Sequence, residues 1–264
     1  MLALLLLLAP QPAAAEPKVY DAMADVARVF AAVLSEHVKG IEPSELARRA
    51  IDGMLGGLDA HTRRIEPAAQ AANSPLGCLV DRGVLHLTVS TFMDRRQNDW
   101  LRDCADLRAG RPLLLDLRGN TGGRIASALA LADLLVGEAA LFKEQRRDGV
   151  VEHRSTARHL DVPGIVVAID GGTASAAELL AMALRDHGRA LVVGQRSRGK
   201  LTVQTPIFLS DGSVALITTG RVTPTPGAAA GIVPDQAFPA NAAAVACAHA
   251  RGRWRQNRCG LATE

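Results

Sequence analysis

Residues 165–187 read IVVAIDGGTASAAELLAMALRDH, and this stretch decides the expected fold. The apolar run from Ile165 to Ile169 predicts a buried strand, and the two glycines that follow predict a tight turn. Residues 176–187 have the composition of a helix. A buried strand that passes through a turn into a helix is the building unit of α/β folds. The sequence therefore predicts an α/β core with Ser175 at the start of a helix.

Short apolar runs and helical patterns alternate over much of the remaining chain. Strands are predicted at residues 78–80, 84–88, 113–115, 191–193, 202–209 and 213–219, and a helix at residues 125–136. The first two strands flank an Asp81-Arg82-Gly83 turn, which predicts a hairpin. Together these elements place the main domain at residues 76–240.

The N-terminal part has helical periodicity instead. Apolar residues recur at helical spacing from Val19 to Val38. Ser44 is expected to cap a second helix, which Gly56-Gly57 ends. Residues 16–75 are therefore predicted to form an N-terminal helical subdomain followed by a connector at residues 66–75. Residues 241–264 are expected to be a C-terminal tail rich in Ala and Arg.

The first residues, MLALLLLLA, form an apolar run that is too short to cross a bilayer. Three alanines before Glu16 offer the small residues that a signal peptidase prefers. We interpret residues 1–15 as a signal peptide and expect an exported protein, periplasmic or extracellular, with no transmembrane segment in the mature chain. No Lys or Arg precedes the apolar run, so an N-terminal anchor or a wrongly assigned start is the alternative.

Composition limits the partners and cofactors. The four cysteines, Cys78, Cys104, Cys247 and Cys259, allow three pairings, of which we favour a Cys247–Cys259 bridge. Neither the cysteines nor the seven histidines have the spacing of a compact zinc site, so no metal and no cofactor is expected. The net charge of +3 and the 3% of aromatic residues disfavour a nucleic-acid partner.

Two residues are candidates for covalent chemistry. Ser175 precedes a predicted helix whose free N–H groups and positive dipole end would face its hydroxyl, and an ordinary helix cap is the alternative interpretation. Lys200 ends a loop that follows a predicted strand. A lysine acts as a general base only when its pKa is lowered enough to leave the amine neutral, which arginine cannot do. Because only four of the 30 basic residues are lysine, a lysine at this position is mildly informative.

A second glycine-rich turn, DLRGNTGG at residues 116–123, follows the predicted 113–115 strand. Its glycines would let backbone N–H groups approach a substrate carbonyl, and a turn that binds nothing is the alternative. The sequence GQRSRGK at residues 194–200 has the spacing of a phosphate-binding loop. Leu201 occupies the position that such a loop gives to Ser or Thr, and a strand is predicted next, so the nucleotide interpretation fails.

Together these motifs resemble the carboxyl-terminal processing proteases, the S41 family of serine peptidases. The resemblance covers most of residues 50–236 and runs through the segments 58–62, 116–123, 173–178, 199–204 and 231–235. It implies the ββα-superhelix core of the ClpP/crotonase group and an endopeptidase that acts on polypeptides. Whether a homodimer or an adaptor protein takes part stays open.

The resemblance also implies a role for each candidate residue. Ser175 is the implied nucleophile, Lys200 its base, Gln204 the residue that orients the lysine, Gly122 and Ala176 the oxyanion donors, and Glu178 a supporting acid. The family normally carries a PDZ domain before the protease core, but residues 63–77 are too few to form one, so a compact form is expected. Leu201 stands where the family has a glycine.

Two other functions remain open from the sequence. The main alternative is a non-catalytic module that binds a peptide or a small ligand on the same fold. Acyl-CoA chemistry of the crotonase type is weaker, because an exported protein rarely meets CoA and the Ser/Lys pair would be unexplained. The function that the sequence favours is an exported serine endopeptidase with a Ser175/Lys200 dyad.

Overall fold

The computed structural model describes residues 17–66, 76–92, 95–156, 159–223, 231–238 and 245–246. The chain divides into two compact units, Met1–Leu58 and Asp59–Glu264. The predicted signal peptide, nearly all of the 66–75 connector and most of the predicted tail lie outside the described residues. Within the described ranges, every helix is too short or too polar to cross a membrane.

The described residues of the first unit contain two helices. α1 spans Pro17–Glu36 and α2 spans Pro43–Leu55, which confirms the helical periodicity read from the sequence. The predicted cap at Ser44 is wrong, because the N-cap of α2 is Glu42, two residues earlier, and Pro43 is the first residue of the helix. Proline suits that place, since its ring presets the helical φ and the first N–H groups of a helix have no partner within it.

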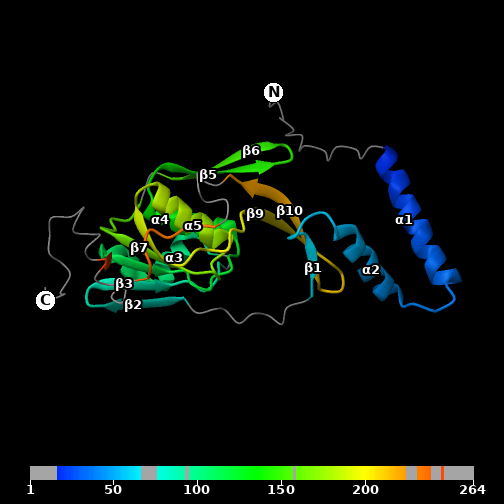
Figure 1. Ribbon diagram of the computed structural model, residues 1–264, viewed down its shortest axis with the longest axis horizontal. Coiled ribbons are helices and arrows are strands. Elements are labelled where there is room, and N and C mark those ends of the chain that lie inside the picture. Colours follow the sequence, from blue (N-terminus) through cyan, green and yellow to red (C-terminus); the bar gives the residue numbers. More distant parts are fainter. Residues whose placement is uncertain are drawn as a thin grey trace, which may run out of the picture. The chain divides into compact units, whose positions relative to one another are not determined.

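The second unit contains two sheets (Figure 1). The first sheet has the order β2-β3-β4-β7-β8, formed by β2 (Gly77–Asp81), β3 (Val84–Thr88), β4 (Leu113–Asp116), β7 (Ile165–Ile169) and β8 (Ala190–Gly194). β2 and β3 are the predicted antiparallel hairpin, and the other neighbours are parallel. The carboxyl ends of the parallel strands therefore lie at one edge of the sheet, where α/β proteins bind their ligands.

Helices cover one face of this sheet. They are α3 (Gln97–Asp103), α4 (Ile125–Leu135) and α5 (Ala176–Asp186), and a short 3-10 helix, η1 (Ala105–Ala109), follows α3. Side chains alternate along β4: Leu113 and Leu115 enter the main core with the helices, whereas Leu114 joins a smaller cluster on the opposite face. Burial on both faces explains why the parallel strands read as unbroken apolar runs.

The second sheet is antiparallel and has the order β1-β10-β5-β6, with β9 paired to β10. Its strands are β1 (Arg63–Ile65), β5 (Ala139–Arg146), β6 (Gly149–Ser155), β9 (Thr202–Phe208) and β10 (Val214–Val222). Strands were predicted at residues 202–209 and 213–219, close to β9 and β10, but β1, α3, η1, β5 and β6 were not predicted. β5 and β6 form a ribbon with many exposed charged residues, and the apolar run of β5 is confined to its first four residues, 139–142.

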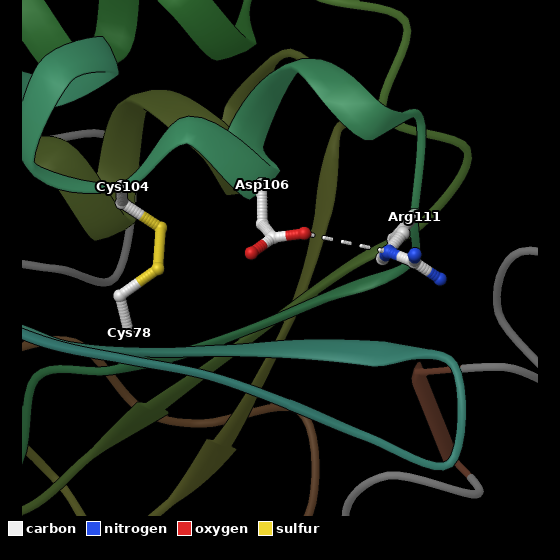
Figure 2. The surroundings of a disulfide bond; sticks show 4 residues. All are labelled: Cys78, Cys104, Asp106 and Arg111. Carbon is white, nitrogen blue, oxygen red and sulfur yellow. Dashed lines mark ion pairs between the residues drawn. A yellow bond between two sulfur atoms is a disulfide. The ribbon is translucent and has the colours of Figure 1, made fainter.

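A disulfide ties the first sheet to the helical layer. Cys78 in β2 bonds to Cys104, the residue after α3, with their Cα atoms 5.8 Å apart (Figure 2). Beside the bridge, Asp106 of η1 forms an ion pair with Arg111 at 3.8 Å. Of the three possible pairings of the four cysteines, the one that contains the Cys78–Cys104 bridge is also the one that contains the favoured Cys247–Cys259 bridge. That bridge lies outside the described residues and stays a prediction.

Candidate functional site

Three loops meet at the carboxyl edge of the parallel strands. They follow β4, β7 and β8 and comprise residues 117–124, 170–175 and 195–201. The Thr173 hydroxyl donates a hydrogen bond to the Leu117 carbonyl at 2.9 Å, and the N–H of Arg198 donates to the Thr173 carbonyl at 2.9 Å. The strand order thus brings together one predicted site residue from each loop, namely Gly122, Ser175 and Lys200.

Ser175 has a strained backbone at the point where β7 turns into α5. Its φ is 56° and its ψ is −123°. Among the described residues, only Arg82 in the hairpin turn is another non-glycine with positive φ. A residue held in such a conformation costs about 1–3 kcal/mol, and strain of this kind gathers at functional sites. The turn leaves Ser175 half-buried, while Ala176 after it is fully buried.

The glycine turn after β4 lies directly against this serine. A Cβ atom at Gly122 would lie 2.7 Å from the Ser175 Cβ and 3.1 Å from the backbone nitrogen of Ala176. Gly122 also has a φ of 103°, which L side chains rarely adopt. Only glycine fits at this position, so the backbone of the second loop comes as close as possible to the predicted nucleophile.

A buried carboxylate fastens the serine turn to the lysine loop. Glu178 has no exposed surface, and its Oε2 accepts hydrogen bonds from the backbone N–H groups of Ser175 at 2.8 Å and Lys200 at 2.9 Å. Its Oε1 accepts from the Ser197 hydroxyl at 2.5 Å and the Gly199 N–H at 2.6 Å. Since both backbone bonds end on one oxygen, the nitrogens of Ser175 and Lys200 lie within about 6 Å of each other.

The ammonium of Lys200 lies in surroundings that favour its neutral form. Burial lowers the pKa of Lys200, and the positive charges of Arg63 and Arg198 lower it further. Its Nζ donates a hydrogen bond to Gln204 Oε1 at 2.7 Å. Lys200 ends the loop before β9 and Gln204 lies within that strand, so the pair is held where the hairpin begins.

Gln204 is itself oriented by the segment that leads into β1. Its Nε2 donates to the carbonyl oxygen of His61. Asp59 shapes that segment, because its carboxylate accepts from the His61 N–H at 2.7 Å and from the Thr62 hydroxyl at 2.7 Å. The Thr62 hydroxyl and the His61 N–H lower the pKa of Asp59 to about 2, so the carboxylate stays charged at neutral pH.

The two predicted oxyanion donors differ in their present partners. Ala176 is the first residue of α5, where the helix itself offers its N–H no acceptor. The N–H of Gly122, in contrast, donates to Asn120 Oδ1 at 2.8 Å. The Asn120 amide is fixed in turn, because its Nδ2 donates to the Val89 carbonyl at 2.8 Å. In this structure the Gly122 N–H is therefore hydrogen-bonded to a side chain of its own loop.

All the predicted site residues lie in this region: Gly122, Ser175, Ala176, Glu178, Lys200 and Gln204. Sequence reasoning missed Asn120 as the partner of Gly122, and it gave no role to Asp59 or His61, although both lie in a motif that was singled out. The side-chain types of Asn120 and Asp59 could have indicated these bonds, since an Asn or Asp in a tight turn often accepts a hydrogen bond from a nearby backbone N–H. Residues 195–201 lead into strand β9, so no helix follows Lys200 as a phosphate-binding loop requires.

Comparisons with known proteins identify relatives of this chain. Residues 71–238 match the sequence profile of peptidase family S41. The chain is similar to a carboxyl-terminal-processing protease of Picosynechococcus sp., with 35% identity over 131 residues that cover 48% of this chain and 31% of that protein. It is also similar to chloroplastic carboxyl-terminal-processing peptidase 3 of Arabidopsis thaliana, with 38% identity over 111 residues that cover 41% of this chain and 21% of that protein. The matched part is less than a third of either relative.

Solved structures share the fold. A photosystem II D1 C-terminal processing protease superposes with a TM-score of 0.51 and 28% identity, over 63% of this chain and 46% of that one. A lipoprotein from Streptococcus agalactiae superposes with a TM-score of 0.64 over 94% of this chain and 100% of that one. At 18% identity, this second likeness concerns the fold alone.

Proposed function

Because the chain belongs to peptidase family S41, we propose that it is a serine-type peptidase that cleaves polypeptides through an acyl-enzyme on Ser175. The observation that carries the proposal is the single buried carboxylate of Glu178, which binds the backbone of both Ser175 and Lys200. A serine and a lysine can act as one catalytic unit only if they are held close together, and this carboxylate holds their backbones.

The first step is attack on the substrate. Neutral Lys200 removes the proton of the Ser175 hydroxyl while Oγ bonds to the carbonyl carbon of the scissile peptide. Burial and the flanking arginines favour the neutral amine that this step requires. Gln204 accepts one N–H of Lys200 and thereby orients the lysine.

The oxyanion that forms is proposed to bind the N–H groups of Ala176 and Gly122. Gly122 would have to exchange its bond to Asn120 Oδ1 for one to the oxyanion. The C–N bond then breaks as the Lys200 ammonium returns its proton to the leaving amine. A water molecule, deprotonated by Lys200, attacks the ester, and Ser175 leaves with the proton as the new carboxyl terminus is released.

Three finer features belong to the same proposal. The core is a ββα superhelix of the ClpP/crotonase type, the protein is exported, and its substrates are polypeptides processed near their carboxyl termini. The names of the relatives support the substrate class. The Cys78–Cys104 bridge supports export, because stable disulfides are typical of oxidising compartments. Association as a homodimer or with an adaptor stays a prediction.

The test is cleavage of a disordered protein followed by mass spectrometry of the products. Ser175→Ala and Lys200→Ala should each lower the rate by more than about a thousandfold, because the two residues act as a unit. Lys200→Arg should be as damaging, since a guanidinium stays protonated. Matched controls are Ser210→Ala and Lys143→Ala, which alter exposed residues outside the proposed dyad. Full activity in the Lys200→Ala protein would refute the dyad.

One observation favours a non-catalytic binding module as the second candidate. The Gly122 N–H is already occupied by Asn120, so one of the two proposed oxyanion donors is not free in this structure. A serine-directed fluorophosphonate probe separates the two functions. Labelling confined to Ser175 favours the enzyme, whereas folded protein that stays unlabelled favours binding alone.

A further inference from the structure

A pocket of about 400 Å³ lies beside Lys200. Its lining includes Gly199 and Leu201, the two neighbours of the lysine in the chain. It also includes His61, whose carbonyl accepts the bond from Gln204. The pocket therefore adjoins the proposed catalytic base, on the side where β9 begins.

Two further lining residues have polar groups that find no partner in the described part of the chain. Thr202 and Arg221 face each other across the β9–β10 hairpin, so their side chains lie on the same face. The Arg221 side chain is exposed and forms no hydrogen bond or ion pair within the described part of the chain. The Thr202 hydroxyl is buried, and it too lacks a hydrogen-bond partner among the described residues. Buried polar groups are nearly always paired, so the Thr202 hydroxyl, which has no partner among the described residues, points to a ligand.

The charge around the pocket is predominantly positive. Arg63 and Arg198 lie near enough to Lys200 to act on its charge, and Arg221 is the strand partner of Thr202, two residues after Lys200. The acidic lining residue, Asp59, already accepts hydrogen bonds from the backbone and hydroxyl of Thr62, among others. A negatively charged group of a substrate would thus enter a region of favourable potential.

We propose that this pocket binds a carboxylate of the polypeptide substrate through the guanidinium of Arg221 and the hydroxyl of Thr202. The inference rests on the proposed function, because it assigns a feature of the substrate to the same site. A carboxylate presents two oxygens in a plane that arginine binds in a bidentate fashion. It belongs either to the free carboxyl terminus of the substrate or to an Asp or Glu side chain close to the scissile bond.

The experiment measures binding to the Ser175→Ala protein, so that it does not depend on turnover. Fluorescence anisotropy is recorded with four labelled peptides of one neutral sequence. One has a free carboxyl terminus, one is amidated, one is amidated with a single internal Glu, and one is amidated with Gln in that place. We expect the peptide that carries the recognised carboxylate to bind about tenfold more tightly than its neutral counterpart. High salt should reduce this difference in affinity.

Variants in the Ser175→Ala background identify the groups responsible. Arg221→Gln should reduce the charged-to-neutral ratio of affinities to below about twofold, and Thr202→Val should reduce it by a smaller factor. Arg108→Gln removes an exposed arginine in η1, away from the pocket, and should leave the ratio unchanged. Thermal melting of each variant checks that it is folded.

The outcomes separate this inference from the proposed function. A preference for the free terminus or for internal Glu, lost in Arg221→Gln, supports the inference and names the source of the carboxylate. Equal binding of charged and neutral peptides, a preference that survives Arg221→Gln, or no binding of any peptide overturns it. The proposed function fails independently if wild type and Ser175→Ala cleave a disordered protein equally well.

Discussion

At the residue scale, the protonation state of Lys200 sets the expected pH dependence. The amine must be neutral to act as a base, so activity should rise as the pH rises through the pKa of Lys200. Burial and the positive charges of Arg63 and Arg198 lower that pKa and move the rise toward neutral pH. Arg198→Gln removes one of these charges, which raises the pKa. The rise in kcat/KM should therefore move to higher pH.

The control for this prediction is Arg147→Gln, which removes an exposed arginine from the β5–β6 turn. Its pH profile should coincide with that of wild type. A profile for Arg198→Gln that moves to lower pH, or does not move at all, would show that Lys200 is not the titrating base.

Glu178 is the residue whose loss should be most damaging to the site without removing a reacting group. Glu178→Gln replaces one acceptor oxygen by an NH2 group, which faces the donors of Ser175 and Lys200 or those of Ser197 and Gly199. We expect the free energy of unfolding to fall by about 2–4 kcal/mol, as for other buried charged hydrogen-bond networks. Activity should fall more than tenfold.

Denaturant unfolding and kcat/KM measured on the same preparations check this expectation. The matched control is Glu152→Gln on β6, where the carboxylate forms an exposed ion pair with Arg154. That change should alter stability by less than about 0.5 kcal/mol. Equal effects of the two substitutions would contradict a special role for Glu178.

The sequence located the candidate residues better than it explained them. Ser175 and Lys200 were found because the N–H groups of a predicted helix would face the serine, because lysine is rare in this chain, and because the flanking motifs resemble a family. The bond from the Lys200 N–H to Glu178 could not be read from the sequence, since it joins positions 22 residues apart that come together through the pairing of β7 with β8. The same holds for the bond from Gln204 to His61.

At the scale of elements, the close approach of two turns makes Gly122 sensitive to substitution. A Cβ at this position would lie 2.7 Å from the Ser175 Cβ and 2.9 Å from the Ala174 carbonyl. Gly122→Ala should therefore push the turn after β4 away from α5, lower activity by more than about a hundredfold and destabilise the protein by about 1–3 kcal/mol.

Gly119 offers a matched control in the same turn. Its φ of 70° is also positive, but a Cβ there would meet no atom within 4 Å. Gly119→Ala should cost about 1–2 kcal/mol of backbone strain and leave activity within a few fold of wild type. Melting curves and cleavage assays of both variants distinguish strain from collision. Similar activities in the two variants would argue against contact between the turns.

Elements with a strong apolar pattern were predictable, and the others were not. β7 is buried on both faces and was predicted with its exact bounds, because each of its residues is apolar. β1 has three residues, two of them arginine, and is a strand only because it pairs with β10. α3 escaped prediction for a similar reason, since only Trp100 and Leu101 of its seven residues are buried.

At the scale of the whole molecule, the disulfides offer a test of both the core and the predicted pairing of the two C-terminal cysteines. Cys78 and Cys104 are 26 residues apart, and closing a loop of that length lowers the entropy of the unfolded chain by the equivalent of about 3–4 kcal/mol. Reduction should therefore lower Tm by about 6–12 °C in a chain of this size. In a Cys247→Ser, Cys259→Ser double variant, Cys78 and Cys104 are the remaining cysteines, so a fall in Tm on reduction is due to their bridge.

Peptide mapping without reduction identifies the pairs directly. Trypsin should release residues 65–82 joined to residues 103–108, which contain Cys78 and Cys104. Residues 222–251 should be joined to residues 259–264 if Cys247 and Cys259 form the second bridge. Both linked pairs should disappear after reduction. A peptide that joins Cys78 to either C-terminal cysteine would contradict the bridge between β2 and α3, and with it the way in which the hairpin is fixed to the helical layer.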